Sequence, residues 1–170
     1  MKSPVESSQQ RWSVTNEAEM LDFCDRSFTP AYRCAARLTR GDGPAAEDLV
    51  QDAFVRLVRA VRTDDVDEIG VGWLITTIRH RFIDRLRSTE REDRRLRLVA
   101  TEPSTTDVRP SLTEALLEGL SDRERAALIF RYVDDLPVAE VAHLLGSSVR
   151  ATESLLQRAK RNARGTENAS

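Results

Sequence analysis

Aromatic residues are scarce in this chain of 170 residues, where Phe, Trp and Tyr together make up 5% of the sequence. So low an aromatic content, beside abundant Ala, Leu, Arg and Glu, favours helices over sheets. Long apolar stretches are missing as well: no apolar run is longer than residues 126–130, and no signal-peptide core follows Met1. We therefore expect a chain that neither spans a membrane nor enters the secretory route.

Cysteine is also rare, and the two that occur, Cys24 and Cys34, fall in what reads as a single helix. The helical rise would place their Cα atoms about 15 Å apart, far beyond disulfide reach. We expect buried or free thiols in a reducing cytoplasm. The sequence shows no glycine-rich nucleotide loop, no Cys/His zinc spacing and no Ser/His/Asp ordering, so we predict a protein that is not an enzyme and needs no metal or cofactor.

Neither sign of charge dominates, because the formal net charge is −2, but the charges are unevenly placed. Residues 79–97 hold eight Arg against four acids, and residues 147–164 hold five basic residues against one acid. Each segment thus carries a net charge of +4, and the rest of the chain carries −10. Two separated basic segments predict two contact points on one polyanion, such as a nucleic acid.

The C-terminal part of the chain has the pattern of a helix-turn-helix. Pro137 suits the first turn of a helix, and apolar residues then recur at helical spacing until Gly146, which is placed to end it. Ser147 and Ser148 follow as candidate N-caps of a second helix over residues 149–164. Two short helices around a tight turn, the second helix basic, are typical of proteins that insert a helix into a DNA groove.

The second helix of this pair has two unlike faces. An inward stripe is predicted for Val149, Thr152, Leu156, Ala159 and Ala163. The opposite face carries Arg150, Ser154, Gln157, Arg158 and Arg161. Arginine and glutamine read guanine and adenine edges or bind phosphates, so this face, with the two serines of the turn, is the candidate DNA-binding surface. The alternative is a solvated surface of a small helical bundle.

The N-terminal half begins with residues 1–15, which are polar and unpatterned, and we expect them to be disordered. Asn16 and Glu19 then form a capping-box pattern at the start of a helix that extends to Leu38. Pro30 should bend or interrupt this helix, because proline removes a backbone donor and clashes with the preceding turn.

A second helix is expected to begin at Pro44, after a turn at residues 41–43. Glu47 and Asp48 fall in its predicted first turn and arginines lie toward its end, which is the arrangement that the helix dipole favours. Its apolar stripe is predicted to consist of Leu49, Val50, Ala53, Phe54, Leu57, Val58 and Val61.

A third helix is predicted from Val71 to about Ser88, and the arginine-rich residues 90–98 continue or restart it. Its buried side should hold Leu74, Ile75, Ile78, Phe82 and Leu86. The other side is basic and holds Trp73, Thr77, Arg79, His80, Arg81, Asp84, Arg85 and Arg87. An aromatic at the edge of an arginine-lined face can stack on an unpaired base while the guanidinium groups hold the backbone. Ordinary packing is the alternative for Trp73, and a plain surface position for His80.

Residues 99–111 lack periodicity and hold prolines, serines and threonines, which is typical of a flexible linker. A short helix from Leu112 to Leu120 comes next, before Ser121 and Glu124 form a capping box that opens a further helix. The predicted fold is all-α. It consists of two small helical domains, residues 16–98 and 112–165, joined by the linker, and the C-terminal domain is the helix-turn-helix.

The chain resembles an extracytoplasmic-function (ECF) sigma factor, a group of bacterial sigma factors with only the second and fourth conserved regions, over residues 17–164. AEDLVQDAFVRL at residues 46–57 resembles the acidic-aliphatic helix with which this family docks on the coiled coil of the largest polymerase subunit. By this resemblance Leu49 and Phe54 belong mainly to the core. The polar groups of the polymerase interface would be Glu47, Asp48, Gln51, Asp52 and Arg56.

WLITTIRHRFIDRLRS at residues 73–88 is similar to the family helix that captures and opens the −10 element, although this chain has His80 where the usual pattern has asparagine. LSDRERAALIFRYVDDLPVAEVAHLLG at residues 120–146 resembles the fourth region, whose recognition helix reads the −35 element. Where many members read Val-Lys-Ser-Arg-Leu in that helix, residues 152–156 read Thr-Glu-Ser-Leu-Leu, which loses two positive charges and gains an acid.

The resemblance implies a cytoplasmic initiation factor that binds core RNA polymerase and promoter DNA and is controlled by an anti-sigma factor. One rival hypothesis is a free-standing helix-turn-helix regulator, which leaves the acidic helix beside the basic Trp73 helix unexplained. Another is a metal-dependent nuclease that uses Glu47, Asp48 and Asp52. Those acids have no histidine or lysine at ligand or base spacing, and acids near a helix start are expected for the dipole alone.

Overall fold

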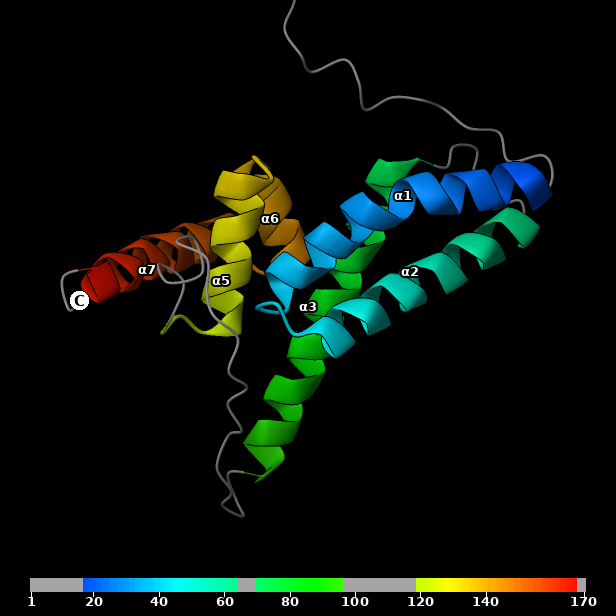
Figure 1. The fold of residues 1–170 in the computed structure, drawn as a ribbon. Helices are drawn as coiled ribbons and strands as arrows, with labels where there is room; N and C mark the ends of the chain where they lie inside the picture. Colours follow the sequence, from blue (N-terminus) through cyan, green and yellow to red (C-terminus); the bar gives the residue numbers. More distant parts are fainter. Residues whose placement is uncertain (1–16, 64–69, 97–118, 168–170) are drawn as a thin grey trace, which may run out of the picture. The chain divides into compact units, whose positions relative to one another are not determined.

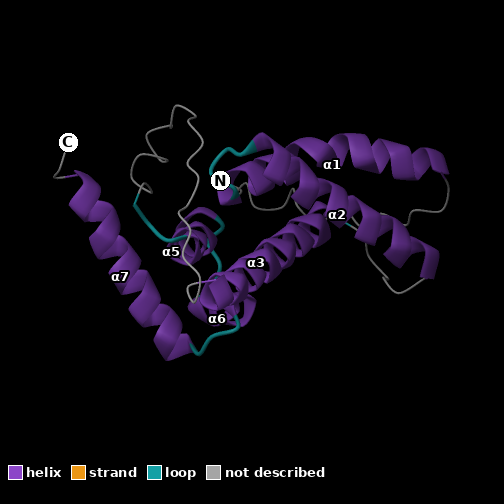
Figure 2. Cartoon of the chain, turned by 90° about the horizontal axis from the view of Figure 1, so that it is seen from below, coloured by secondary structure: helices purple, strands orange, loops and turns teal. Residues whose placement is uncertain are grey.

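The computed structural model describes residues 17–63, 70–96 and 119–167 (Figure 1). In these ranges the regular elements are helices and no strand occurs, so the predicted all-α class is confirmed (Figure 2). The chain divides into two compact units, with the boundary between Phe82 and Ile83. The capping box predicted at Asn16, the linker at residues 99–111 and most of the helix predicted before Leu120 lie outside the described residues. Gly119 and Leu120 are described and are not helical, so that prediction is wrong at these two positions.

The first unit is built on a helical hairpin in which α1 (Glu17–Leu38) and α2 (Gly43–Thr63) lie side by side (Figure 1). A short turn joins them, with Arg40 and Gly41 at positive φ angles of 57° and 77°. Each helix turns an apolar stripe toward the other. The buried residues are Phe23, Ala31, Cys34, Ala35 and Leu38 on α1, and Ala46, Leu49, Val50, Ala53 and Leu57 on α2. Cys24 and Cys34 are free thiols on one helix, as predicted.

Of the predicted bend or interruption at Pro30, the interruption does not occur, because α1 is helical from Glu17 to Leu38. Proline removes one backbone hydrogen bond in a helix interior, but tertiary packing of an amphipathic face supplies most helix stability in proteins. Buried residues lie on both sides of Pro30, at Phe23 and Ser27 before it and at Ala31 after it. Packing on α2 therefore holds the helix together across the missing bond.

The start of α2 also differs from the prediction. The helix begins at Gly43, one residue before Pro44, and Asp42 precedes it with its Oδ1 accepting a hydrogen bond from the Ala45 N–H at 3.0 Å. The first turn holds no acid, so Glu47 and Asp48 lie further along the helix than predicted. Asp42 satisfies a free amide at the helix start, which is the usual role of an N-cap aspartate.

The third helix, α3 (Val71–Leu96), continues without a break through the arginine-rich segment. Its buried residues are Leu74, Ile78, Phe82 and Ile83. Ile75 and Leu86, which we predicted to be buried, are half-buried, and Ile83 was missed. The buried side of α3 is therefore centred about one residue away from the side that we predicted to be buried. The helix spans both compact units.

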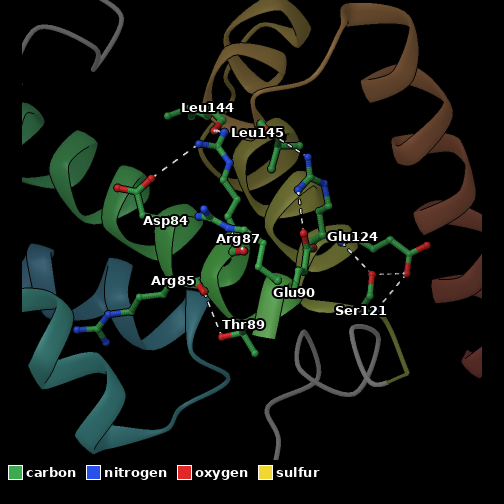
Figure 3. Close-up of polar contacts among 11 residues, drawn as sticks. Asp84, Arg85, Arg87, Thr89, Glu90, Ser121, Glu124, Leu144 and Leu145 are labelled. Carbon is green, nitrogen blue, oxygen red and sulfur yellow. Dashed lines mark hydrogen bonds and ion pairs between the residues drawn. The ribbon is translucent and has the colours of Figure 1, made fainter. Parts of the chain in front are cut away.

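The second unit opens with α5 (Asp122–Leu128), and its predicted capping box is confirmed (Figure 3). Ser121 accepts a hydrogen bond from the Glu124 N–H at 3.3 Å, and the Glu124 carboxylate accepts one from the Ser121 N–H at 3.1 Å. A π-helical turn, η2 (Ile129–Val133), follows directly. Insertions of this kind are rare, and the sequence pattern gave no sign of it.

The helix-turn-helix is confirmed in α6 (Val138–Leu145) and α7 (Val149–Glu167). Gly146 ends α6 with a φ of 57°, a left-handed conformation that favours glycine. The Ser148 Oγ accepts a hydrogen bond from the Ala151 N–H at 3.2 Å and so caps α7. At the end of α6, two arginines of the same unit donate to its last carbonyl groups: Arg87 to Leu144 at 3.3 Å and Arg123 to Leu145 at 2.7 Å.

The inward side of α7 holds Thr152, Leu155, Leu156 and Ala159, all buried. Val149, predicted to be part of this stripe, is 46% exposed, so that prediction is wrong. Val149 is the first residue of α7 and lies at one edge of the stripe. The stripe includes Leu155 at its other edge, because residues at spacings of three and four share a helix face.

Thr152 provides a test of this packing. Its side chain is fully buried, and among the described residues its hydroxyl finds no hydrogen-bond partner. A buried hydroxyl without a partner costs about 1 to 3 kcal/mol. We expect Thr152→Val, which replaces the hydroxyl by a methyl group of similar size, to raise the free energy of unfolding by about 1 kcal/mol in chemical denaturation. Thr152→Ala, which leaves a void, should lower it, and a Val variant less stable than the parent would contradict the burial.

Candidate binding surfaces

The acidic and polar residues predicted on α2 lie together on one exposed face of that helix. Glu47, Asp48, Gln51 and Arg56 are exposed, and Asp52 is half-buried. Leu49 is fully buried, as predicted for a core residue, and Phe54 is half-buried. Val55 adds an exposed apolar side chain to this helix, at 49% exposure, which the sequence prediction did not include. The acids on this face repel the phosphates of DNA, so the face suits a protein partner better than DNA.

Asp52 is engaged within the first unit. Its Oδ2 accepts a hydrogen bond from Nη2 of Arg81 at 3.1 Å, so a residue predicted for polymerase binding is paired with one predicted for −10 DNA. Both side chains are less than half exposed. The pair ties α2 to α3, and a substitution at Asp52 would therefore disturb both predicted surfaces.

The predicted DNA-binding residues of α3 are mostly half-buried. His80 and Asp84 are exposed, while the others keep part of their surface accessible: Trp73, Thr77, Arg79, Arg81, Arg85 and Arg87. Trp73 lies in the first turn of α3, where its backbone N–H donates a hydrogen bond to the Gly70 carbonyl at 3.0 Å. Asp84 is 3.8 Å from Arg87 one turn along, and Thr89 donates to the Arg85 carbonyl (Figure 3). Trp73 is thus neither fully buried nor fully exposed.

The predicted DNA-binding residues of α7 lie on its exposed side. Ser148, Arg150, Ser154, Gln157, Arg158 and Arg161 are exposed, and Ser147 is half-buried. Two of these have local roles: the Ser148 hydroxyl caps α7, and the Ser154 hydroxyl donates to the Arg150 carbonyl at 3.0 Å. Glu153 is exposed on the same helix, whereas Leu155 is buried. Of the two positions in this helix where the family pattern has a positive charge, Glu153 therefore places an acid at the surface, and Leu155 places an apolar side chain in the core.

Arg158 has a partner that the sequence did not reveal. Its Nε donates to Oε1 of Glu124 at 2.8 Å, and Asn162 Nδ2 donates to the same oxygen at 3.2 Å. The other oxygen of Glu124 accepts from the Ser121 N–H and Oγ at 3.1 and 2.9 Å. Burial raises the pKa of the Glu124 carboxyl, but the hydrogen bonds from Arg158 and Ser121 and the positive charge of Arg158 outweigh burial, so its pKa is below the ordinary value. The carboxylate therefore stabilises the fold above about pH 4.3 and loses this effect as the pH falls through the lowered pKa.

A second group near α7 was also missed. Tyr132 is 51% exposed, and its ring lies 4.4 Å from the Lys160 Nζ and 5.6 Å from the Arg131 guanidinium carbon. Pairs of this kind contribute about 0.5 to 1 kcal/mol at exposed sites. The sequence around Tyr132 does not predict this contact, because Lys160 lies on a different helix.

Within the residues that the structure describes, no three His, Cys, Asp or Glu side chains are grouped so that they could hold a metal ion. None of the helices in those ranges is both long enough and apolar enough to cross a membrane.

Two family models match the chain, one for each of the predicted regions. Residues 26–92 match the model of sigma-70 region 2, and residues 112–162 match that of sigma-70 region 4. The chain therefore belongs to the sigma-70 family, whose members are non-enzymatic transcription initiation factors.

Similar proteins place it in the ECF group of this family. A Mycobacterium tuberculosis protein described as "Probable ECF RNA polymerase sigma factor SigI" is 31% identical over 136 residues, 71% of this chain and 46% of that protein. The ECF RNA polymerase sigma factor SigK of Mycobacterium ulcerans is 27% identical over 161 residues, 87% of this chain and 85% of that protein. The chain thus spans about half the length of the first relative and most of the second.

A solved structure shares the fold. The sigma factor RpoE from Bartonella quintana, solved in complex with the anti-sigma factor NepR, matches with a TM-score of 0.58 and 22% identity. The match covers 88% of this chain and 97% of that chain. The predicted resemblance to ECF sigma factors is confirmed by these comparisons, while the role of each surface residue stays a prediction.

Proposed function

We propose that this chain is an alternative sigma factor that binds core RNA polymerase and directs it to promoters in the bacterial cytoplasm. The observation that carries the proposal is the recognition helix α7, which presents arginines and Gln157 on its exposed side directly after a helix-turn-helix turn. The region 2 match supplies the second half of the argument, since a free-standing regulator does not need that region.

In this proposal three surfaces of the chain bind three different partners. The exposed face of α2, which includes Glu47 and Asp48, binds core polymerase. The basic side of α3 captures the −10 element and stabilises its separated strands, with Trp73 stacked on an unpaired base. The exposed side of α7 lies in the major groove of the −35 element. Each surface alone is small, and joining two DNA-binding surfaces in one chain raises the effective concentration of the second once the first is bound.

Control by a second protein is part of this proposal. We propose an anti-sigma factor as that partner, in keeping with the complex in which the Bartonella quintana neighbour was solved. An anti-sigma factor would act by covering the polymerase-binding or DNA-binding surfaces. Co-purification from cells followed by identification of bound proteins tests this partner.

Recognition of the −35 element is tested by changing exposed side chains of α7. We assign Arg150 and Gln157 to base edges, because helix-turn-helix proteins present the N-terminal part of the second helix to the groove floor. Arg158 and Arg161, toward the C-terminal end, we assign to phosphates. Arg150→Ala and Gln157→Ala should each weaken binding by about 1 to 3 kcal/mol and relax the preferred sequence at one position. Arg161→Ala is the matched control, since loss of a phosphate contact weakens all sequences alike.

The measurement is selection from randomised −35 DNA with holoenzyme reconstituted from each variant. If the sequence preferences selected by the Arg150 and Gln157 variants both match that of the parent, the base-contact assignment is refuted.

A further inference from the structure

We propose that Glu124 is a positioning residue for promoter DNA: it holds the Arg158 guanidinium by its Nε edge, so that the terminal nitrogens of Arg158 are presented to a backbone phosphate. This inference rests on the proposed function, since it names the ligand of one side chain on the recognition helix.

Glu124 is suited to hold another side chain because it is itself fixed. It is buried, with 6% exposure, and each of its two carboxylate oxygens accepts two hydrogen bonds. Two of the four donors belong to Ser121 at the start of α5, so the carboxylate is anchored to the backbone of that helix. The other two donors, Arg158 and Asn162, come from α7 one turn apart. A carboxylate held in this way cannot turn outward to follow a mobile arginine.

Arg158 is only partly used by this contact. Glu124 accepts a hydrogen bond from Nε at 2.8 Å, while the Arg158 side chain is 60% exposed. The two terminal nitrogens carry four further N–H donors, in a planar fork that matches the oxygens of a phosphate. The anchored edge and the free edge of one guanidinium thus face different partners.

Two consequences follow for binding. Arg158 loses little conformational freedom when it meets a phosphate, because its rotamer is already fixed by Glu124, and such preorganisation raises affinity without a new contact. Lysine cannot replace it, since an ammonium group drawn to Glu124 has no second, outward-facing edge. A tie that served only to join α5 to α7 would affect stability but not the dependence of DNA binding on salt.

The test compares Arg158→Lys with Arg33→Lys in the full chain assembled with core polymerase, on a promoter duplex that carries a selected −35 element. Affinity is measured over a range of salt concentrations. Both variants keep the charge, and both positions are exposed. Arg33 lies on α1, outside the surfaces proposed to bind polymerase or DNA. We expect Arg158→Lys to bind about tenfold more weakly, with a salt slope lower by about one, because one phosphate contact is lost. Arg33→Lys should stay within about twofold of the parent with its slope unchanged.

Glu124→Gln completes a double-mutant cycle. If Glu124 acts through Arg158, this variant should lose the same contact, and adding Arg158→Lys should weaken binding little further. If Glu124→Gln does not fold, the comparison of the two lysine variants decides alone. Arg158→Lys binding as tightly as the parent, or binding more weakly with an unchanged salt slope, would overturn the inference. Failure of the parent holoenzyme to bind the promoter at all would refute the proposed function, and the inference with it.

Discussion

Reversal of the charges at Glu47 and Asp48 is expected to abolish co-elution of this chain with core RNA polymerase. Both acids are exposed on α2, and neither is needed to start the helix, because Asp42 caps it. Removing an exposed charge costs only about 0.2 to 1 kcal/mol, but placing like charges against each other across an interface costs several. We therefore expect Glu47→Arg combined with Asp48→Arg to weaken binding at least a hundredfold, from about 3 kcal/mol of lost affinity.

The control for this experiment is chosen to keep the fold intact. Asp52 is unsuitable for charge reversal, because an arginine there would face Arg81, its present partner at 3.1 Å. Glu19→Arg reverses an exposed acid on α1 and should leave co-elution unchanged. Far-UV circular dichroism should show unaltered helicity in every variant. Retained co-elution of the Glu47/Asp48 variant would remove α2 from the proposed interface.

Loss of the Trp73 ring is expected to impair promoter opening more than promoter binding. Trp73 is half-buried in the first turn of α3, and a base stacked on an aromatic ring contributes about 1 to 3 kcal/mol. Trp73→Ala should thus reduce the open complex by about 5- to 150-fold, while Trp73→Phe, which keeps a stacking surface, should lose less. Permanganate reactivity of −10 thymines measures strand opening directly.

The competing role of Trp73 is packing, and the same variants separate the two. If packing is its only role, Trp73→Ala should lower the melting temperature, and the open and closed complexes should fall together. An alanine variant with unchanged thermal stability and unchanged permanganate reactivity would contradict both roles.

Local signals in the sequence were enough to predict several elements of the fold. Ser121 and Glu124 lie three residues apart and satisfy each other's backbone, and Gly146 ends α6 in a conformation that favours glycine. Such features depend on residues within one turn of each other, so a short stretch of sequence is enough to predict them. The exposed side of α7 was predictable for the same reason, since helical periodicity alone separates Gln157 from the buried Leu156.

Features that depend on contacts between helices were not predictable. Glu124 was identified as a capping residue, but its contact with Arg158 spans 34 positions, and no pattern along the chain encodes it. The pair of Asp52 and Arg81 is a similar case, in which each residue had been assigned to a different surface. Pro30 shows the opposite effect. Proline locally disfavours a continuous helix, but α1, which packs on α2, continues through it.

Reconstituted transcription tests the central proposal most directly. The full chain is mixed with core RNA polymerase and a library of DNA carrying randomised upstream sequence, and the RNA products are sequenced together with their templates. A sigma factor predicts transcripts that depend on the added chain and start at a fixed distance downstream of a two-part motif. DNA bound by the chain alone, with no transcripts that depend on it, would contradict the account and favour a free-standing regulator.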